Sequence, residues 1–128
     1  MIFRHLHIYI APSNLGGRGV FAKRKICADE PIEICPVVVL PPEDLPKIHA
    51  SKLHDYYFLW GDDEKSCAVA LGYGSLYNHS YTPNAEYEMN FEAETLDIYA
   101  LRDIEAEEEI TFNYNGVADD SAPVWFDK

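Results

Sequence analysis

Residues 77–87 have the sequence YNHSYTPNAEY, in which two asparagines, a histidine, a serine, a threonine and a proline lie between tyrosines. Proline and small polar residues of this kind usually mark a loop. A connecting loop alone does not require so many hydrogen-bonding side chains close together. The segment is therefore a candidate site, and the rest of the chain has to define its role.

The clearest strand pattern of the chain begins at the end of this segment. Apolar residues alternate with polar ones from Ala85 to Phe91 and again from Leu96 to Ala100, around a turn of sequence EAET. Two alternating runs separated by a short turn predict an antiparallel hairpin.

The remaining chain also favours short strands. A strand pair is expected over residues 30–40, bent or interrupted at Pro36, because proline donates no hydrogen bond to a sheet. The only helical candidate is 41–60, where Pro46 limits the length of any one helix. Further strands are predicted at 6–10, 20–26, 67–71 and 110–114. The sum is a mostly-β domain with short helical segments.

One short spacing of apolar and acidic residues occurs twice, each time as a polar turn that leads into a strand. The members are Ile26, Ala28, Glu30 and Ile32, and then Ile104, Ala106, Glu108 and Ile110. The match is too short to indicate a repeat architecture.

Charge is distributed unevenly along the 128 residues, which have the length of one domain. Residues 1–85 hold 8 basic and 9 acidic side chains (net −1), whereas residues 86–128 hold 2 and 13 (net −11). An acidic region of this kind repels nucleic acid and attracts Lys-rich peptides. The simpler alternative is a solvated surface that aids solubility.

The three cysteines form no CxxC pair, so neither a disulfide framework nor a cysteine zinc site is expected. A reducing, intracellular setting fits them. The apolar N-terminal stretch is too short and too interrupted by Arg and His to span a membrane. We therefore expect an intracellular soluble protein, in the cytoplasm or in the nucleus of a host.

Several familiar kinds of site fit poorly. The glycine clusters at 16–19 and 71–76 lack the Lys-Ser/Thr of a phosphate loop and the βαβ context of a dinucleotide site. His5 and His7 share a strand face and could bind a metal, but no third ligand has a suitable spacing. A Cys67 nucleophile with His79 stays open from composition alone.

Three stretches in this order, GGRGVFA (16–22), NHSYTPNAEY (78–87) and EEEITFNY (107–114), together resemble the SET-domain family of protein lysine methyltransferases. The resemblance covers residues 8–114 and is closest to the small stand-alone bacterial and viral members. It implies one domain over 1–128 with its core at 8–114, small β-sheets, and a knot-like threading of the C-terminal segment.

The resemblance also implies a cofactor, S-adenosyl-L-methionine, and the residues that hold it. Gly17, Arg18 and Gly19 match the segment whose backbone approaches the cofactor, and Asn78 and His79 match the pair that holds its two ends. No metal is implied. The resemblance implies a basic protein or peptide substrate, with a histone-like protein as one candidate, and the small viral members suggest a homodimer.

Tyrosines carry the implied chemistry, because a hydroxyl can orient a lysine amine without adding a charge. Tyr114 matches the tyrosine beside the transferred methyl group, and Tyr87 matches the position that limits how many methyl groups are added. Tyr56 resembles an active-site tyrosine of the viral members, with Tyr57 an equal candidate. For Tyr87, simple packing in the hairpin is the alternative.

The C-terminal tail, residues 115–128, has no zinc-binding cysteines, unlike that of many family members. Either Trp125 and Phe126 fold back over the cofactor and cover the active site, or the tail is frayed. Two rival functions also stay open: a non-catalytic module that binds basic peptides, and a metal-dependent hydrolase using His5 and His7.

Overall fold

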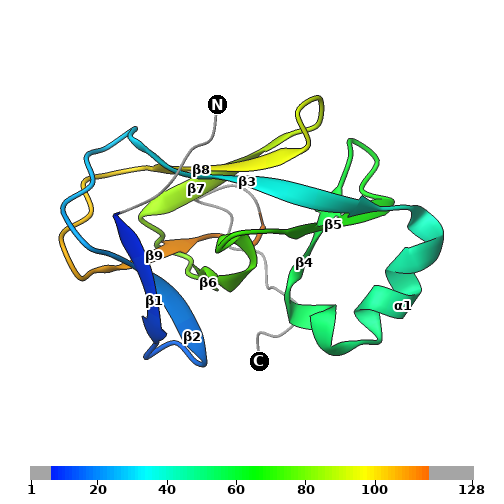
Figure 1. Cartoon of the computed structure of the whole chain (residues 1–128), viewed down its shortest axis with the longest axis horizontal. Helices are drawn as coiled ribbons and strands as arrows, with labels where there is room; N and C mark the ends of the chain where they lie inside the picture. Colours follow the sequence, from blue (N-terminus) through cyan, green and yellow to red (C-terminus); the bar gives the residue numbers. More distant parts are fainter. Residues whose placement is uncertain (1–6, 116–128) are drawn as a thin grey trace.

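The computed structural model describes residues 7–115, which form two small β-sheets connected by turns and short helices (Figure 1). The smaller sheet has four strands in the order β1-β2-β9-β6. Its strands are β1 (Ile8–Pro12), β2 (Arg18–Ala22), β9 (Glu109–Phe112) and β6 (Asn78–His79). Strand β9, the last one within residues 7–115, therefore lies inside this sheet, antiparallel to β2 and parallel to β6.

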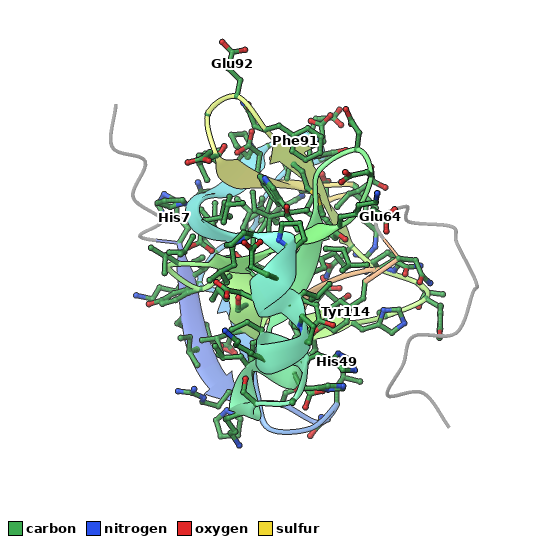
Figure 2. The ribbon with its side chains drawn as sticks, turned by 90° about the vertical axis from the view of Figure 1, so that its right-hand side faces the viewer. His7, His49, Glu64, Phe91, Glu92 and Tyr114 are labelled. Atoms are coloured by element: carbon green, nitrogen blue, oxygen red, sulfur yellow. The ribbon has the colours of Figure 1, made fainter. Side chains whose placement is uncertain are left out.

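The larger sheet has five antiparallel strands in the order β4-β5-β3-β8-β7. They are β4 (Tyr57–Trp60), β5 (Ser66–Ala70), β3 (Pro31–Leu40), β8 (Thr95–Ala100) and β7 (Ala85–Asn90). Strands β7 and β8 form the predicted hairpin. Phe91 lies in the turn and is exposed, and Glu92 points away from the body at the tip (Figure 2). The prediction of a mostly-β domain with several small sheets is confirmed.

Within residues 7–115, helical structure is confined to short segments, as the position of Pro46 predicted. They are η1 (Pro42–Asp44), α1 (Leu45–His49), η2 (Lys52–Asp55) and η3 (Gly74–Leu76). The helical prediction was wrong over Tyr57–Trp60, which forms strand β4. Aromatic residues favour strands, and pairing with β5 decides the conformation of this run. No helix in residues 7–115 is long and apolar enough to cross a membrane.

The expected interruption at Pro36 was also wrong, because β3 continues through it. Pro36 is the residue at which β3 exchanges one neighbour for the other. Residues 31–36 pair with β8, and residues 37–40 pair with β5. The carbonyl of Pro36 accepts a hydrogen bond from Leu71 N–H at 2.9 Å, just past the end of β5. In an antiparallel sheet, the N–H and the C=O of one residue point to the same neighbouring strand. The absent N–H of Pro36 would therefore point towards β5, so the proline removes no hydrogen bond between β3 and β8.

Two turns of the same construction connect the sheets. The first turn (residues 24–32) leads into β3, and the second turn (residues 102–110) leads into β9. They meet at one antiparallel bridge, where the backbones of Ile26 and Ile104 exchange hydrogen bonds of 2.8 and 2.7 Å. Both side chains are buried in the core. The short spacing that occurs twice in the sequence is thus a local structure that occurs twice.

The two turns are closed by equivalent contacts. Glu30 accepts hydrogen bonds from an N–H three residues earlier and an arginine six residues earlier, both at 3.0 Å. Glu108 does the same at 3.0 and 2.9 Å. The preceding residues, Asp29 and Glu107, have φ angles of 68° and 69°. Four features of backbone and side chain therefore coincide, and the two sequences are identical at five of nine positions, including the arginine that bonds the glutamate.

Candidate active site

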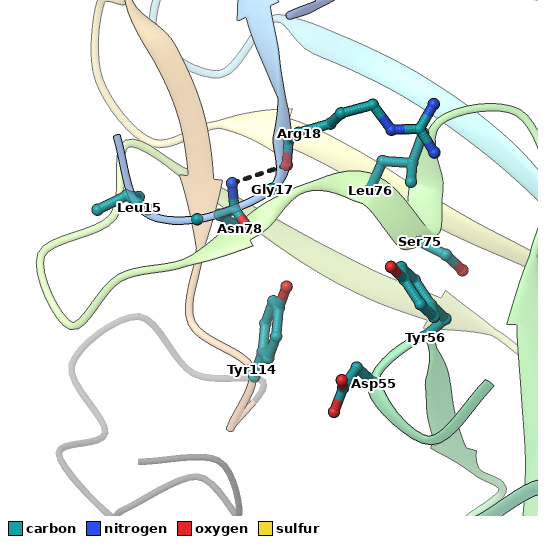
Figure 3. Close-up of a pocket in the computed structure, with 10 residues that line it drawn as sticks. Leu15, Gly17, Arg18, Asp55, Tyr56, Ser75, Leu76, Asn78 and Tyr114 are labelled. Atoms are coloured by element: carbon teal, nitrogen blue, oxygen red, sulfur yellow. Dashed lines mark hydrogen bonds between the residues drawn. The ribbon is translucent and has the colours of Figure 1, made fainter. Parts of the chain in front are cut away.

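A cavity of about 280 Å³ brings together segments that are far apart in the sequence (Figure 3). Its walls are the turn before β2 (residues 15–18), the end of η2 (Asp55 and Tyr56), the segment 75–78 and Tyr114. Three of these four parts contain residues of the stretches that the sequence singled out. The fourth, from η2, supplies the tyrosine that was one of two candidates.

Backbone without side chains forms one wall of the cavity. Gly16 and Gly17 have φ angles of 121° and 56°, a region in which residues with a Cβ atom are strained. A Cβ atom added to either glycine would meet no protein atom within 4 Å. The backbone here borders open space, so a ligand can approach it closely.

Asn78 joins this turn to β9. Its amide nitrogen donates to the carbonyl oxygen of Arg18 at 3.0 Å and to the carboxylate of Glu109 at 2.8 Å. The same carboxylate accepts a hydrogen bond from Ser13 Oγ at 2.7 Å. Glu109, which sequence reasoning did not select, therefore fixes both the turn and the asparagine.

Gly19 was predicted to approach the cofactor, but it does not line the cavity. A Cβ atom on Gly19 would collide with Glu109 Oε2 and would lie 2.9 Å from Asn78 Nδ2. Glycine is needed here because β2 and β9 pack closely together behind the cavity wall. The neighbouring Gly17 and Arg18 do reach the cavity.

Tyr114 stands just after β9 and is held at both its backbone and its side chain. Its hydroxyl donates to the carbonyl oxygen of Tyr77, and its N–H donates to His79 Nδ1 at 3.0 Å. Burial raises the pKa of the Tyr114 hydroxyl, and the nearby charge of Asp55 raises it further. The group therefore stays neutral and serves as a dipole.

His79 does not itself line the cavity. Its ring lies 5.2 Å from that of Tyr114 and 4.3 Å from that of Tyr81, measured between centroids. Its position beside Tyr114 supports the tyrosine that faces the cavity.

The structure separates the two candidate tyrosines of η2 and β4. Tyr56 lines the cavity, and Figure 3 shows its hydroxyl and that of Tyr114 at the ring ends nearer the Gly17–Arg18 turn. Tyr57 is buried in β4, and its hydroxyl is 2.7 Å from His49 Nδ1. Tyr56 is thus placed for contact with a ligand, and Tyr57 for packing.

Tyr87 lies behind Tyr114 and does not line the cavity. Its hydroxyl donates to the carbonyl oxygen of Tyr114 at 3.4 Å, and its ring contacts Phe58 and Phe112. Burial, with a smaller contribution from Glu64, raises its pKa to about 12. It packs in the core and touches the backbone of Tyr114, and its role in limiting the number of added methyl groups stays a prediction.

Asp55 is the charged cavity residue that sequence reasoning missed. It is exposed, and it lines the same cavity as Tyr56 and Tyr114. Its carboxylate also lies 3.0 Å from His54 Nδ1. Only its place next to Tyr56 in the sequence could have indicated it, because a lone aspartate at a helical end is common on any surface.

The rival sites gain no support from the described residues. His7 is exposed at the start of β1 and lies on the opposite side of the molecule from Tyr114 in Figure 2. Residues 7–115 hold no group of three potential metal ligands, and His5 lies outside them. Cys67 is buried in β5, where burial raises its thiol pKa and disfavours the nucleophilic thiolate. Trp125 and Phe126 also lie outside the described residues.

Comparison with known proteins identifies relatives over most of the described region. The model of the SET domain matches residues 17–115. The histone-lysine N-methyltransferase, H3 lysine-37 specific, of Schizosaccharomyces pombe is 34% identical over 100 residues, which are 77% of this chain and 66% of that protein. The chain thus spans about two thirds of that relative's length.

Solved structures agree with this match. A Plasmodium falciparum protein provisionally named a histone methyltransferase is 34% identical, with a TM-score of 0.71 over 94% of this chain and 96% of that one. Part of a Chaetomium thermophilum Polycomb Repressive Complex 2, a humanized mutant bound to the inhibitor GSK126, has a TM-score of 0.67 at 20% identity. That match covers 84% of this chain and 14% of that one, and it shows the shared fold alone.

Proposed function

Because the chain belongs to the SET-domain family, we propose that it is an S-adenosylmethionine-dependent protein-lysine N-methyltransferase acting on a basic protein segment. The observation that carries the proposal is the cavity in which the Gly16–Gly17 backbone, Asn78, Tyr56 and Tyr114 meet. The name of the curated relative supports the same activity.

The residues present fit the proposed cofactor. The open backbone at Gly17 allows close approach, Leu15 and Leu76 add apolar surface, and Asn78 and Arg18 add polar groups. When bound, S-adenosylmethionine supplies a methyl group activated by a sulfonium. The role of the chain is to align an acceptor with it, which can lower a barrier by several kcal/mol.

The acceptor lysine has to be neutral, although its ordinary pKa is about 10.4. Buried aromatic surroundings lower the pKa of an amine, because they disfavour its charged form. Tyr56 and Tyr114 offer hydroxyl dipoles that orient the amine without holding it protonated. The carboxylate of Asp55, which is exposed, attracts the incoming ammonium group before it enters.

The acidic character of the chain supports a basic substrate. The formal net charge is −12, and residues 86–128 carry −11 of it. The names of the relatives point to histones, so we propose a histone-like segment as the substrate. Affinity for such a peptide should fall steeply with ionic strength.

Transfer of a labelled methyl group from S-adenosylmethionine to basic peptides tests the proposal. Tyr114→Phe should lower kcat by about 100-fold or more, as removal of a well-placed catalytic dipole does. Tyr99→Phe is the matched control, because Tyr99 bonds Glu86 in the large sheet, away from the cavity. Undiminished transfer by Tyr114→Phe would disprove its assigned role.

The second candidate is a non-catalytic module that binds basic peptides. The acidic residues 86–128 favour the module and the enzyme equally, whereas the cavity does not favour the module. Calorimetry with the cofactor separates the two, since the module predicts no binding. The expected homodimer and the knot-like threading also stay predictions, which sedimentation and an experimental structure would test.

A further inference from the structure

A buried carboxyl group lies behind the cavity wall, on the central strand of the large sheet. Glu33 in β3 is only 8% exposed. One of its oxygens accepts a hydrogen bond from the hydroxyl of Tyr77 at 2.8 Å, and the other accepts from the backbone N–H of Tyr73 at 3.0 Å. The carboxyl group therefore bonds both ends of the segment 73–77.

This segment is packed directly on the carboxyl group. A Cβ atom on Gly72 would lie 2.5 Å from Glu33 Oε2, so no side chain fits between them. Burying a carboxyl group is costly unless its oxygens are hydrogen-bonded. Here both oxygens are bonded to one short segment, so Glu33 determines where that segment lies.

The segment 73–77 leads straight to the proposed active site. Ser75 and Leu76 line the cavity, and the carbonyl oxygen of Tyr77 accepts the hydrogen bond from the Tyr114 hydroxyl. The ring of Tyr77 is stacked on Phe112 of β9, with 5.3 Å between centroids. A shift of Tyr77 would therefore move the acceptor that orients the Tyr114 hydroxyl.

We propose that Glu33 is a positioning residue for methyl transfer: it holds Tyr77, and Tyr77 in turn holds the hydroxyl of Tyr114. This inference rests on the function proposed above. It assigns a role in the reaction to a residue of β3 that touches neither the cavity nor Tyr114. Glu33 acts on the geometry of the site and not on any reacting atom.

Two single substitutions test the connection. Glu33→Gln keeps the size of the side chain but offers one acceptor oxygen where two are needed, and its NH2 group would face a donor. Tyr77→Phe removes only the hydroxyl that Glu33 binds. Each variant should lower kcat by about 10- to 100-fold, the range expected when a reacting group is misplaced by up to 1 Å.

The double variant and a control distinguish positioning from a general loss of stability. If Glu33 acts through Tyr77, the kcat of the double variant should be no lower than that of the worse single variant. Leu96→Ala, in the buried core of β8, should lower Tm while kcat, measured well below Tm, is unchanged. Additive losses in kcat, or single variants that behave like Leu96→Ala, would overturn the proposal.

Hydrogen exchange of the protein without cofactor gives a readout that does not depend on activity. The N–H of Tyr73 bonds Glu33, and the N–H of Leu76 bonds the Tyr73 carbonyl oxygen at 2.8 Å. Both amides should exchange faster in Glu33→Gln and not in Leu96→Ala. Unchanged exchange would refute the positioning role. An inactive wild-type protein would instead refute the proposed function and leave this measurement valid.

Discussion

The first and second turns have the same local structure but different consequences for the molecule. In each turn a glutamate carboxylate accepts a backbone hydrogen bond, one residue has a positive φ angle, and an isoleucine is buried at the shared bridge. The first leads into β3, the central strand of the large sheet. The second leads into β9 and, directly after it, to Tyr114. The same local interactions thus produce a scaffold strand in one place and an active-site strand in the other.

The difference lies in what surrounds each glutamate. Glu108 also lies 3.3 Å from Asn84 Nδ2, and Asn84 Oδ1 accepts from the N–H of Thr111 in β9. The next residue, Glu109, holds Asn78 at the cavity. The site contacts of the first turn begin only at Glu33. Substitutions in the second turn should therefore disturb the cavity more than substitutions in the first turn.

The largest expected effect is on stability, at the bridge that the two turns share. Ile26→Ala and Ile104→Ala should each lower the free energy of unfolding by about 2–5 kcal/mol, the usual cost of such a cavity. Because the turns meet at the bridge, the losses in the double variant should not add. Urea unfolding measures all three. Strict additivity would show that the turns are independent.

The next prediction concerns a difference between the first and second turns. Glu30→Ala and Glu108→Ala should each cost about 1–2 kcal/mol of unfolding free energy, since both leave a turn without its acceptor. Only Glu108→Ala should also weaken cofactor binding, through Asn84 and β9. Calorimetry with S-adenosylmethionine, alongside urea unfolding, measures both quantities. Equal binding by the two variants would contradict the asymmetry.

Acid should destabilise both turns, because the glutamate of each turn has a lowered pKa. The Cys27 N–H, opposed by burial and aided by Arg24, lowers the pKa of Glu30 below its ordinary value of 4.5. Burial alone would raise the pKa of Glu108, but hydrogen bonds from Arg102 and the Glu105 N–H lower it.

A carboxyl group with a lowered pKa in the folded state stabilises the protein above its unfolded pKa of about 4.5. This stability is lost as the pH falls through the lower, folded pKa. The variant carrying Glu30→Gln and Glu108→Gln should therefore show a smaller fall in Tm between pH 6 and pH 3 than the wild type. An equal fall would mean that other carboxyl groups cause the acid sensitivity.

The smallest expected effect tests whether the two turns carry the same backbone strain. Asp29 and Glu107 are exposed and have positive φ angles, a conformation that glycine adopts more easily. Asp29→Gly and Glu107→Gly should each stabilise the protein by a few tenths to about 1 kcal/mol, after the entropy of glycine is subtracted. Thermal unfolding compares them. Opposite signs would show that the turns differ in strain.

Local patterns were sufficient to predict some of these elements. Alternation identified the β7–β8 hairpin, and Pro46 predicted short helical turns, because both signals depend on neighbours in the sequence. The twofold spacing around Ile26 and Ile104 was visible but too short to interpret. Its meaning depends on a bridge between residues that are far apart.

The errors arose where tertiary pairing decides the outcome. Tyr57–Trp60 forms a strand because β5 lies beside it, and Pro36 is tolerated because its missing N–H falls past the end of β5. The resemblance to a family indicated the stretches that meet at the cavity. It could not show that Glu109, and not a ligand, fills the space beside Gly19, nor that Asp55 faces the cavity.

The position of β9 between β2 and β6 has a consequence for the order of folding. Residues 109–112 complete a sheet whose other strands are made much earlier, so the small sheet cannot form while the ribosome is still adding them. Contacts this distant in sequence slow folding. Until β9 inserts, one edge each of β2 and β6 stays unpaired and open to association with other chains. Asn78 and Tyr114 therefore reach their places at the cavity only once β9 has paired with β2 and β6, and the same pairing covers the open strand edges.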